Sequence, residues 1–434
     1  MTLLSGALKI KSGELVDTIH STAEQFGAKN RWGPEQSQTG VRRLALSDLD
    51  KGVKDWFVKE TKSLGCTVKI DEVGNIFATY PGRNNDAKPT GMGSHLDTQP
   101  TGGRYDGIFG VLSGLQVLRT LKANNYVPNY PITLVDWCNE EGARFAMSIM
   151  ASSVWAGIST KEHVYALKDV YDNKTTVLEE LNRIGYKGTE KCSHMANPLK
   201  CHFEIHIEQG PILEKIGKKI GVLTSAQAYT WIEVTFKGMP QHTGTTPMDY
   251  RRDSLLATGK VITGINDIAK KYGGVATVGK LSLSPNVVNV IPGEVNFVVD
   301  IRHEEDEGLH KMYKAVRELL AEVILNKAGN GVPLEADIED PYPTPAAIFN
   351  SELVDLIDES AKSVVGEEYA HRMISGAGHD SCATNTVIPT AMIFVPSKNG
   401  ISHNPEEYTK PEELEDGFRV LLETVLRYDE SRTD

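Results

Sequence analysis

The feature that most constrains the fold is a set of three predicted strands that each end, or nearly end, in residues able to bind a metal. The segments are 90–95, 132–137 and 203–207, and the first of them ends at His95. A helical pattern at 108–121 follows that first segment. Buried strands that alternate with helices predict a largely parallel sheet, and such sheets place their chemistry beyond the carboxyl ends of the strands. We therefore predict an α/β fold with a site at that edge.

Apolar periodicity divides the rest of the chain into further elements. Helices are predicted at 12–26, 44–64, 108–121, 147–155, 249–270, 309–325, 351–365 and 411–428. Further strands are predicted at 68–71, 75–80, 230–236, 277–283, 287–291, 295–302 and 390–395. Ser47 is the expected N-cap of the second helix, and the helix at 108–121 is expected to be amphipathic. Residues 27–40 should form a loop, and residues 160–193 a polar excursion on the surface.

The length and a change of pattern indicate two domains. A chain of 434 residues exceeds one core of usual size. Near Ala226 the pattern changes to strand, helix, three strands and helix, and the α/β pattern resumes after the proline-rich stretch that ends at Pro345. We predict that residues 228–344 form an inserted α+β domain, and that residues 1–227 and 345–434 together form one discontinuous domain.

Charge and cysteine usage restrict the partners. The net charge is -12, and basic residues do not cluster, which argues against nucleic acid or a membrane surface as a partner. The five cysteines are odd in number and contain no Cys-x-x-Cys, which favours a reducing compartment. No apolar run approaches a membrane span, and the sequence starts without a signal-peptide pattern. We therefore expect a cytoplasmic protein.

Three imidazoles and two carboxylates form a candidate set of metal ligands. They belong to His95, Asp106, Glu141, His206 and His403. Two metal ions about 3.5–4 Å apart need one bridging carboxylate, and Asp106, on the glycine-rich loop after His95, is best placed for that role. Nitrogen-rich ligands favour two zinc ions per subunit, with manganese, nickel or cobalt as alternatives.

Two further acids are expected to support this set. Asp97 lies two residues after His95 and is predicted to orient that imidazole. Glu140 is the expected general base, since deprotonation of a metal-bound water needs a carboxylate within hydrogen-bond reach. Adjacent residues at a strand end point in different directions, so Glu141 can bind metal while Glu140 faces the water.

Each of these residues, taken alone, has an ordinary structural explanation. His206 stands between two isoleucines and could be a hydrogen-bonded core histidine, and His403 could be a loop histidine. Glu140 and Glu141 could be a solvated pair, and His95 could belong to a solvated loop beside a helix cap. The combination of five residues of the right types, four of them near predicted strand ends, favours a metal centre.

Five strings in the chain resemble the dizinc amidohydrolases that cleave N-carbamoyl amino acids. They are Gly-Ser-His-Leu-Asp-Thr-Gln-Pro, Gly-Gly-Arg-Tyr-Asp-Gly-Ile-Phe-Gly-Val, Asn-Glu-Glu-Gly-Ala-Arg-Phe, Phe-Glu-Ile-His-Ile-Glu-Gln-Gly-Pro and Gly-Ala-Gly-His-Asp-Ser. Within that group the chain most resembles the yeast-type β-alanine synthases (β-ureidopropionases), through the shorter strings at 152–155, 227–229 and 396–400. Allantoate amidohydrolases and bacterial carbamoylases share the core strings.

The resemblance implies a zinc-exopeptidase-like catalytic domain with a mixed, largely parallel sheet, and an inserted lid that also forms a homodimer. It matches the same five ligands, with Glu140 as general base. It also implies substrate contacts at Gln209, Asn289, Arg302 and His379, and at His242, which would reach into the partner subunit's site. His242 is followed by a threonine where relatives usually have alanine, which puts the local packing in doubt.

A reaction on a ureido acid follows from these roles. Arg302, after a predicted buried strand, could hold a substrate carboxylate with two parallel hydrogen bonds, although an exposed strand-end arginine is the ordinary alternative. His242, on a glycine-flanked loop, could stabilise the oxyanion after closure. N-carbamoyl-β-alanine is the favoured substrate, giving an amino acid, ammonia and carbon dioxide.

Three other functions stay open. The first is an allantoate amidohydrolase or an N-carbamoyl-L-α-amino acid hydrolase, the second is a metallo-exopeptidase, and the third is a catalytically silent protein that binds small acids.

Overall fold

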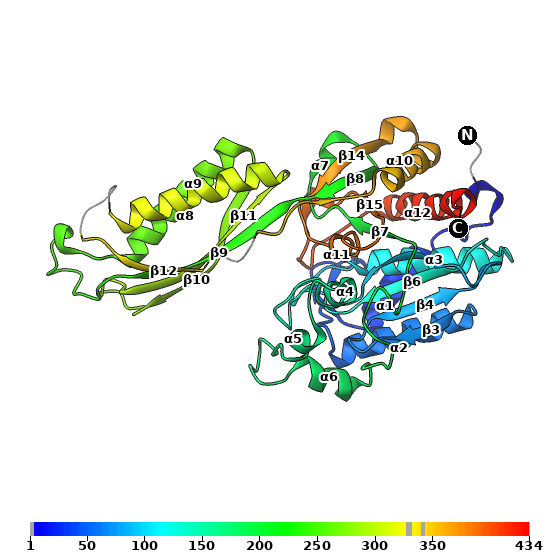
Figure 1. The fold of residues 1–434 in the computed structure, drawn as a ribbon, viewed down its shortest axis with the longest axis horizontal. Helices are drawn as coiled ribbons and strands as arrows, with labels where there is room; N and C mark the ends of the chain where they lie inside the picture. The colour runs from blue at the N-terminus through cyan, green and yellow to red at the C-terminus, as the bar shows by residue number, and fades with distance from the viewer. Residues whose placement is uncertain (1–3, 327–331, 340–342, 434) are drawn as a thin grey trace. The chain divides into compact units, whose positions relative to one another are not determined.

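Two compact units make up the chain (Figure 1). The computed structural model describes residues 4–326, 332–339 and 343–433. The first unit contains residues 1–224 and 348–434, and the second contains residues 225–347. One continuous stretch is therefore inserted into a discontinuous unit.

A nine-stranded mixed sheet forms the centre of the first unit. Its order is β13-β8-β15-β7-β5-β6-β4-β3, and β14 pairs with β8. The strands are β3 (Thr67–Ile70), β4 (Ile76–Tyr80), β5 (Thr90–His95), β6 (Ile132–Trp137), β7 (Cys201–Ile207), β8 (Ile220–Ala226), β13 (Ala347–Ile348), β14 (Ala370–Ser375) and β15 (Thr390–Val395). The central strands β15, β7, β5 and β6 are parallel to one another. The pairs β15–β8, β6–β4 and β4–β3 are antiparallel. The predicted α/β class with a largely parallel sheet is confirmed.

Helices cover this sheet and explain the composition of its central strands. They are α1 (Glu14–Gln25), α2 (Asp48–Ser63), α3 (Ile108–Ala123), α4 (Met150–Ala156), α5 (Lys161–Tyr165), α6 (Val177–Ile184), α7 (Ile212–Ile216), α10 (Ser351–Val365), α11 (Asp380–Thr384) and α12 (Pro411–Ser431). Every residue of β5, β6, β7 and β15 is buried. Burial on both faces is why β6 and β15 are mainly apolar, whereas β5 and β7 also bury polar residues near the metal-ligand candidates.

The helix after the central loop differs from its prediction. The amphipathic pattern expected for 108–121 is wrong, because α3 is buried on almost every side. It packs on β5, and α1 and α12 cover its other surfaces. The predicted apolar residues of α3 are buried, but polar residues elsewhere on the helix, such as Ser113 and Gln116, are buried as well.

Other differences lie at the edges of the sheet system. Residues 27–40 are not all loop, because β1 (Ala28–Arg31) and β2 (Thr39–Val41) pair antiparallel. The strands β8 and β14 were not predicted. These segments are short or contain polar and glycine residues, so they lack the apolar run that marks a central strand.

The second unit is a four-stranded antiparallel sheet covered on one face by two helices (Figure 1). The order is β10-β11-β9-β12, with β9 (Ala228–Lys237), β10 (Val275–Ser284), β11 (Glu294–His303) and β12 (Glu335–Glu339). The helices α8 (Ser254–Tyr272) and α9 (Asp306–Ile324) lie side by side on that face. Along β9, buried and less buried residues alternate, as one covered face requires.

One predicted strand of this unit is wrong. Residues 287–291 form a loop, in which Val288 is fully exposed and Val290 makes an isolated bridge to His242. Their β-branched residues resemble a strand, but no neighbouring strand pairs along them. Among the described residues, no helix combines the length and apolar character needed to cross a membrane.

Candidate metal centre

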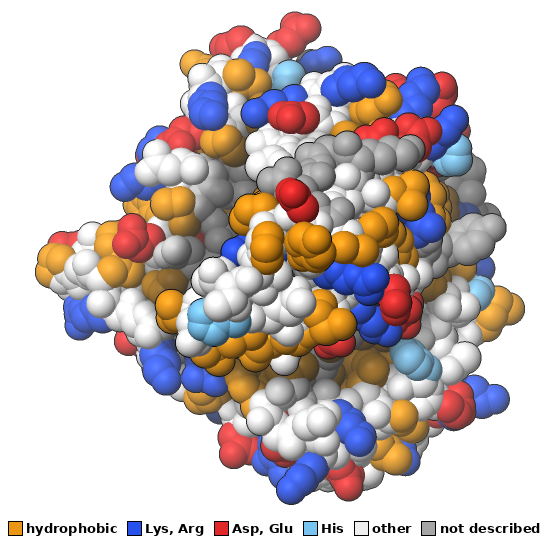
Figure 2. Space-filling model, turned by 90° about the vertical axis from the view of Figure 1, so that its left-hand side faces the viewer, with side chains coloured by type: hydrophobic (Ala, Val, Ile, Leu, Met, Phe, Trp, Pro, Cys, Tyr) orange, Lys and Arg blue, Asp and Glu red, His pale blue; other side chains and the backbone are white. Residues whose placement is uncertain are grey.

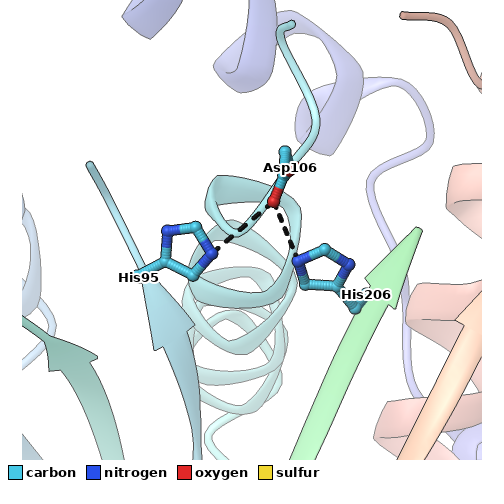
Figure 3. Close-up of side chains that lie close together, drawn as sticks. All are labelled: His95, Asp106 and His206. Carbon is cyan, nitrogen blue, oxygen red and sulfur yellow. Dashed lines mark ion pairs between the residues drawn. The ribbon is translucent and has the colours of Figure 1, made fainter. Parts of the chain in front are cut away.

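Two buried histidines face the same carboxylate oxygen of Asp106 (Figure 3). His95 ends β5, His206 lies near the end of the adjacent strand β7, and Asp106 lies just before α3. The Nε2 atoms of His95 and His206 are 3.6 and 3.1 Å from Asp106 Oδ1. All three side chains are buried. The parallel register of the sheet therefore collects one group of potential metal ligands at the carboxyl ends of two strands.

A second group forms on the other oxygen of Asp106. His403 Nε2 lies 3.3 Å from Asp106 Oδ2 and 3.5 Å from Glu141 Oε2. Asp106, Glu141 and His403 offer ligand atoms within 4.8 Å of one another, as do His95, Asp106 and His206. The structure thus brings all five sequence-predicted ligands together, with Asp106 common to both groups.

The ring orientation of the two buried histidines suits metal binding. His95 Nδ1 is 3.0 Å from the Asp97 carbonyl oxygen, and His206 Nδ1 is 2.8 Å from the Ile207 carbonyl oxygen. A proton on each Nδ1 would be donated to those carbonyls, which leaves Nε2 with its lone pair toward Asp106. Main-chain carbonyls therefore favour the tautomer that a divalent metal needs.

The charges at the site also fit a bound cation. Burial raises the pKa of Glu141 to about 7, and repulsion from Asp106 adds to the shift. Burial alone would raise the pKa of Asp106, but hydrogen bonds from His206, His403 and His95 hold that pKa well below its usual range. The ionised form of each carboxyl group is therefore stabilised only where positive charge lies close to it. Two divalent cations held by imidazole and carboxylate donors would supply that charge.

Glu140 lies beside the first ligand group. Its Oε2 is 3.5 Å from His95 Nε2, and the side chain is largely buried. Burial raises the pKa of Glu140 well above its usual range, against the opposing attraction of His95. A carboxyl group that can hold a proton near neutral pH has the property that the sequence-based role of general base and acid requires.

Asp97 makes different contacts from those expected. Its carboxylate Oδ1 is 3.8 Å from His95 Nδ1, and its own carbonyl oxygen is the nearer partner of that ring. The Asp97 carboxylate instead accepts the backbone N–H groups of Glu140 and Glu141, at 3.2 and 3.3 Å. Asp97 therefore orients the backbone of the Glu140–Glu141 turn.

Two predicted substrate contacts of the first unit also lie at the metal centre. Gln209 has a positive φ of 58°, and its Nε2 donates to Asp106 Oδ2 at 2.8 Å. The His379 ring lies 4.8 Å from the His206 ring, and burial lowers the pKa of His379 to about 3. His379 is therefore neutral at physiological pH, and its Nε2 is 2.9 Å from Ser375 Oγ.

The other three predicted contacts belong to the second unit. The Arg302 guanidinium pairs with Asp300 at 2.8 Å and lies over the Tyr229 ring at 5.6 Å. His242 is exposed, and its Nδ1 accepts the Gly244 N–H at 3.0 Å. The Asn289 carbonyl accepts the N–H of the residue after His242 at 3.1 Å. The roles of His242, Asn289 and Arg302 stay predictions.

Three residues at the centre were missed by the sequence. Gln99 donates from Nε2 to Glu141 Oε2 at 2.7 Å. Ser402 and Glu407 contact each other and the Asp106 segment. Gln99 stands in a string used for the family resemblance, whereas a lone buried acid four residues after His403 gives no recognisable pattern.

Comparison with known proteins gives similarity over most of the chain. Residues 91–427 match the family described as peptidase family M20/M25/M40. An N-carbamoyl-L-amino-acid amidohydrolase of Rhizobium meliloti is 40% identical over 391 residues, which cover 89% of this chain and 91% of the relative. An allantoate amidohydrolase of Bacillus subtilis is 32% identical over 403 residues, which cover 89% of this chain and 92% of the relative.

A solved structure extends this similarity to the fold. The crystal structure of an amidase of the hydantoinase/carbamoylase family from Burkholderia vietnamiensis has a TM-score of 0.85 and 42% sequence identity. The match covers 97% of this chain and 98% of that one.

Proposed function

Because the chain belongs to peptidase family M20/M25/M40, a family of hydrolases, and its relatives include N-carbamoyl-L-amino-acid amidohydrolases, we propose that it hydrolyses the carbamoyl C–N bond of a ureido acid with two divalent metal ions. The products would be an amino acid, ammonia and carbon dioxide. Zinc is the proposed metal, with manganese, nickel or cobalt as alternatives, since imidazole and carboxylate donors suit all four.

The observation that carries this proposal is the position of Asp106 between two ligand groups. One oxygen faces His95 and His206, and the other faces His403. Two metals bound there would polarise the carbamoyl carbonyl and lower the pKa of the attacking water. The five donors lie close to the arrangement that a pair of metal ions needs, and this supports hydrolysis over simple binding.

Residues of the chain would move the protons. Glu140 would accept a proton from the attacking water and deliver it to the departing nitrogen. The raised pKa of Glu140 supports the second half of that transfer, since it helps the carboxyl group to keep the proton until the departing nitrogen takes it. Asp97 would keep Glu140 in place through its bond to the Glu140 N–H.

Residues of both units would hold the substrate. Arg302 would bind the substrate carboxylate, and Gln209, Asn289 and His379 would be further substrate contacts. Arg302 already faces one carboxylate, that of Asp300, so the substrate would share the guanidinium fork with this internal acid. His242, supplied by the partner subunit, would stabilise the oxyanion.

The relatives favour one substrate class over another. The N-carbamoyl-L-amino-acid amidohydrolase at 40% identity supports an N-carbamoyl-L-α-amino acid, and allantoate is supported by a relative at 32%. The N-carbamoyl-β-alanine preference rests on the short strings at 152–155, 227–229 and 396–400, and we keep it as the second candidate.

A substrate panel tests the proposal. Metal-free protein would be reconstituted with zinc or manganese and given an N-carbamoyl-L-α-amino acid, N-carbamoyl-β-alanine, allantoate and a dipeptide, with ammonia and free amino acid as the readouts. We expect ammonia release from a ureido acid and none from the dipeptide. Amino acid release from the dipeptide alone would establish an exopeptidase, and metal uptake without any turnover would indicate a binding protein.

We also propose that the inserted segment, 228–344, is a lid through which two copies form a homodimer. On α8 of the second unit, Leu255, Leu256 and Ile262 are exposed, and β10 is an edge strand of its sheet. Figure 2 shows hydrophobic side chains, with charged ones among them, on the face of the molecule that it draws. An apolar helix face beside an open strand edge is typical of an interface between subunits.

For location, we propose the cytoplasm. All five cysteines are free thiols, and four of them are buried, as suits a reducing compartment.

A further inference from the structure

We propose that Glu407 is a positioning residue that holds Asp106 and His403 in register for the metal pair. The inference deepens the proposed function, because it assigns a residue to the assembly of the same dimetal site. Glu407 contacts neither a ligand imidazole nor the candidate base. It acts on the two chain segments that carry Asp106 and His403.

One oxygen of Glu407 fixes the Asp106 segment. Glu407 Oε1 accepts the backbone N–H groups of Tyr105 and Asp106, at 2.9 and 3.1 Å. These residues precede α3, where the chain turns at Gly107 with a positive φ of 66°. A carboxylate that receives both N–H groups fixes the peptide planes, and thereby the direction in which the Asp106 side chain leaves the backbone.

The other oxygen fixes the His403 loop. Ser402 Oγ lies 2.8 Å from Glu407 Oε2 and 3.0 Å from Asp106 Oδ2. The hydroxyl of Ser402 can donate its one proton to either carboxyl group and lies within hydrogen-bond distance of both, one residue before His403. Two segments about 300 residues apart in sequence are linked through one acid.

The residues around Glu407 leave space for its buried side chain. Glu407 is fully buried, whereas its neighbour Glu406 is exposed. A Cβ atom at Gly103 would lie 2.2 Å from Glu407 Oε1, so a residue without a side chain is needed there. Burial of an acid beside the Asp106 carboxylate is costly, and three accepted hydrogen bonds offset that cost. An apolar residue would fill the space but would leave two N–H groups without an acceptor.

The second ligand group depends on Glu407 more than the first. His95 and His206 are oriented by their own carbonyl partners. His403 is exposed, and the residue before it is the one bonded to Glu407. Loss of Glu407 should therefore weaken binding by Asp106, Glu141 and His403, and leave binding at His95 and His206 less changed.

The test is calorimetric titration of zinc or manganese into metal-free Glu407→Ala, Glu407→Gln, Ser402→Ala and the matched control Glu406→Ala. We expect two binding steps in the wild type and in the control. In Glu407→Ala the weaker step should lose about 10- to 100-fold in affinity, the usual effect of a residue that supports metal ligands. Glu407→Gln should restore most of it, since the amide keeps an oxygen for both N–H groups and can donate to Ser402.

A structural role alone would give a different pattern. Thermal unfolding of each metal-free variant reports stability separately from metal affinity. If Glu407→Ala does not fold, Ser402→Ala carries the test and should weaken the same step. Two unchanged steps in both folded variants would overturn the inference while leaving the dimetal function intact. A wild-type protein that takes up no metal would overturn the proposed function itself, and the inference with it.

Discussion

His95 and His206 illustrate how single residues are prepared for chemistry by the backbone around them. Each imidazole has one nitrogen against a main-chain carbonyl and the other against Asp106. Glu140 and Glu141 are adjacent but face different neighbours, since Glu140 lies near His95 and Glu141 lies near His403. Two identical side chains can therefore serve different roles, and substitution can separate them.

Glu140→Gln should lose turnover, whereas Glu141→Gln should lose metal affinity. The first variant should bind both metals and lose about 10²- to 10⁴-fold in kcat, the usual contribution of a general base. The second should lose affinity for the metal held by Asp106, Glu141 and His403. Metal content by elemental analysis and turnover of the best ureido substrate measure the two effects. Near-normal turnover in Glu140→Gln would remove that residue from the mechanism.

The five ligands could be predicted from the sequence because their residue types are specific for metals and four lie near predicted strand ends. Ser402 and Glu407 could not, because serine and glutamate on loops have many ordinary uses. Their proximity to Asp106 arises only when segments far apart in sequence fold together. The bonds from the Glu140 and Glu141 N–H groups to the Asp97 carboxylate were missed for a related reason, since the turn that brings Glu140 to it has no sequence signature.

Among the elements, α2 has an N-cap that the sequence predicts and the structure contains. The predicted cap Ser47 accepts the Asp50 N–H at 3.2 Å. Ser47→Ala should lower the free energy of unfolding by about 1 kcal/mol, the usual loss for an N-cap. Ser63→Ala, at the exposed end of the same helix, should change it by less than about 0.5 kcal/mol. Urea unfolding followed by tryptophan fluorescence measures both, and equal effects would mean that Ser47 does not cap the helix.

The turn between β3 and β4 should give the protein a pH-dependent stability. Burial raises the pKa of Asp71 from its ordinary 3.8 to about 6. Between these values the folded protein holds a proton that the unfolded chain has lost, so stability from this group is present below about pH 4 and is lost as the pH rises through about 6. The loss is on the order of 2–3 kcal/mol.

Comparison with Asp71→Asn isolates this effect from other titrating groups. The free energy of unfolding of the variant, relative to wild type, should increase between about pH 4 and pH 7, because only the wild type loses its proton there. Asp86→Asn changes an exposed acid and serves as the control, with a flat difference expected. A flat difference for Asp71→Asn would show that the folded-state pKa is not raised.

Central and edge strands differ in how well the sequence predicts them. The limits of β5, β6 and β15 agree with the predicted ones. For β6 and β15 the reason is that burial on both faces produces a mainly apolar run with clear ends. The edge elements β1, β2 and β12 have exposed or polar residues and were not predicted. For the loop at 287–291, a run of β-branched residues gave a strand pattern without a pairing partner, because pairing is a tertiary property.

For the whole molecule, the sequence indicates an insertion but cannot show what the insertion does. The candidate metal ligands all lie in the first unit, whereas His242, Asn289 and Arg302 lie in the second. A catalytic role for His242 in the partner's site follows from the family resemblance alone. Mixed dimers can decide whether one subunit completes the site of another.

Glu140→Gln and His242→Ala each disable the proposed reaction by a different residue. If His242 acts in the partner subunit, a mixed dimer holds one site with both Glu140 and His242 intact. Subunit exchange at equal concentrations should then restore about one quarter of wild-type activity, because half of the dimers are mixed and each has one complete site of two. Light scattering would verify the dimer, and labelled subunits would verify exchange. Activity that stays at the level of the separate variants after verified exchange would place His242 in its own subunit's site or outside catalysis.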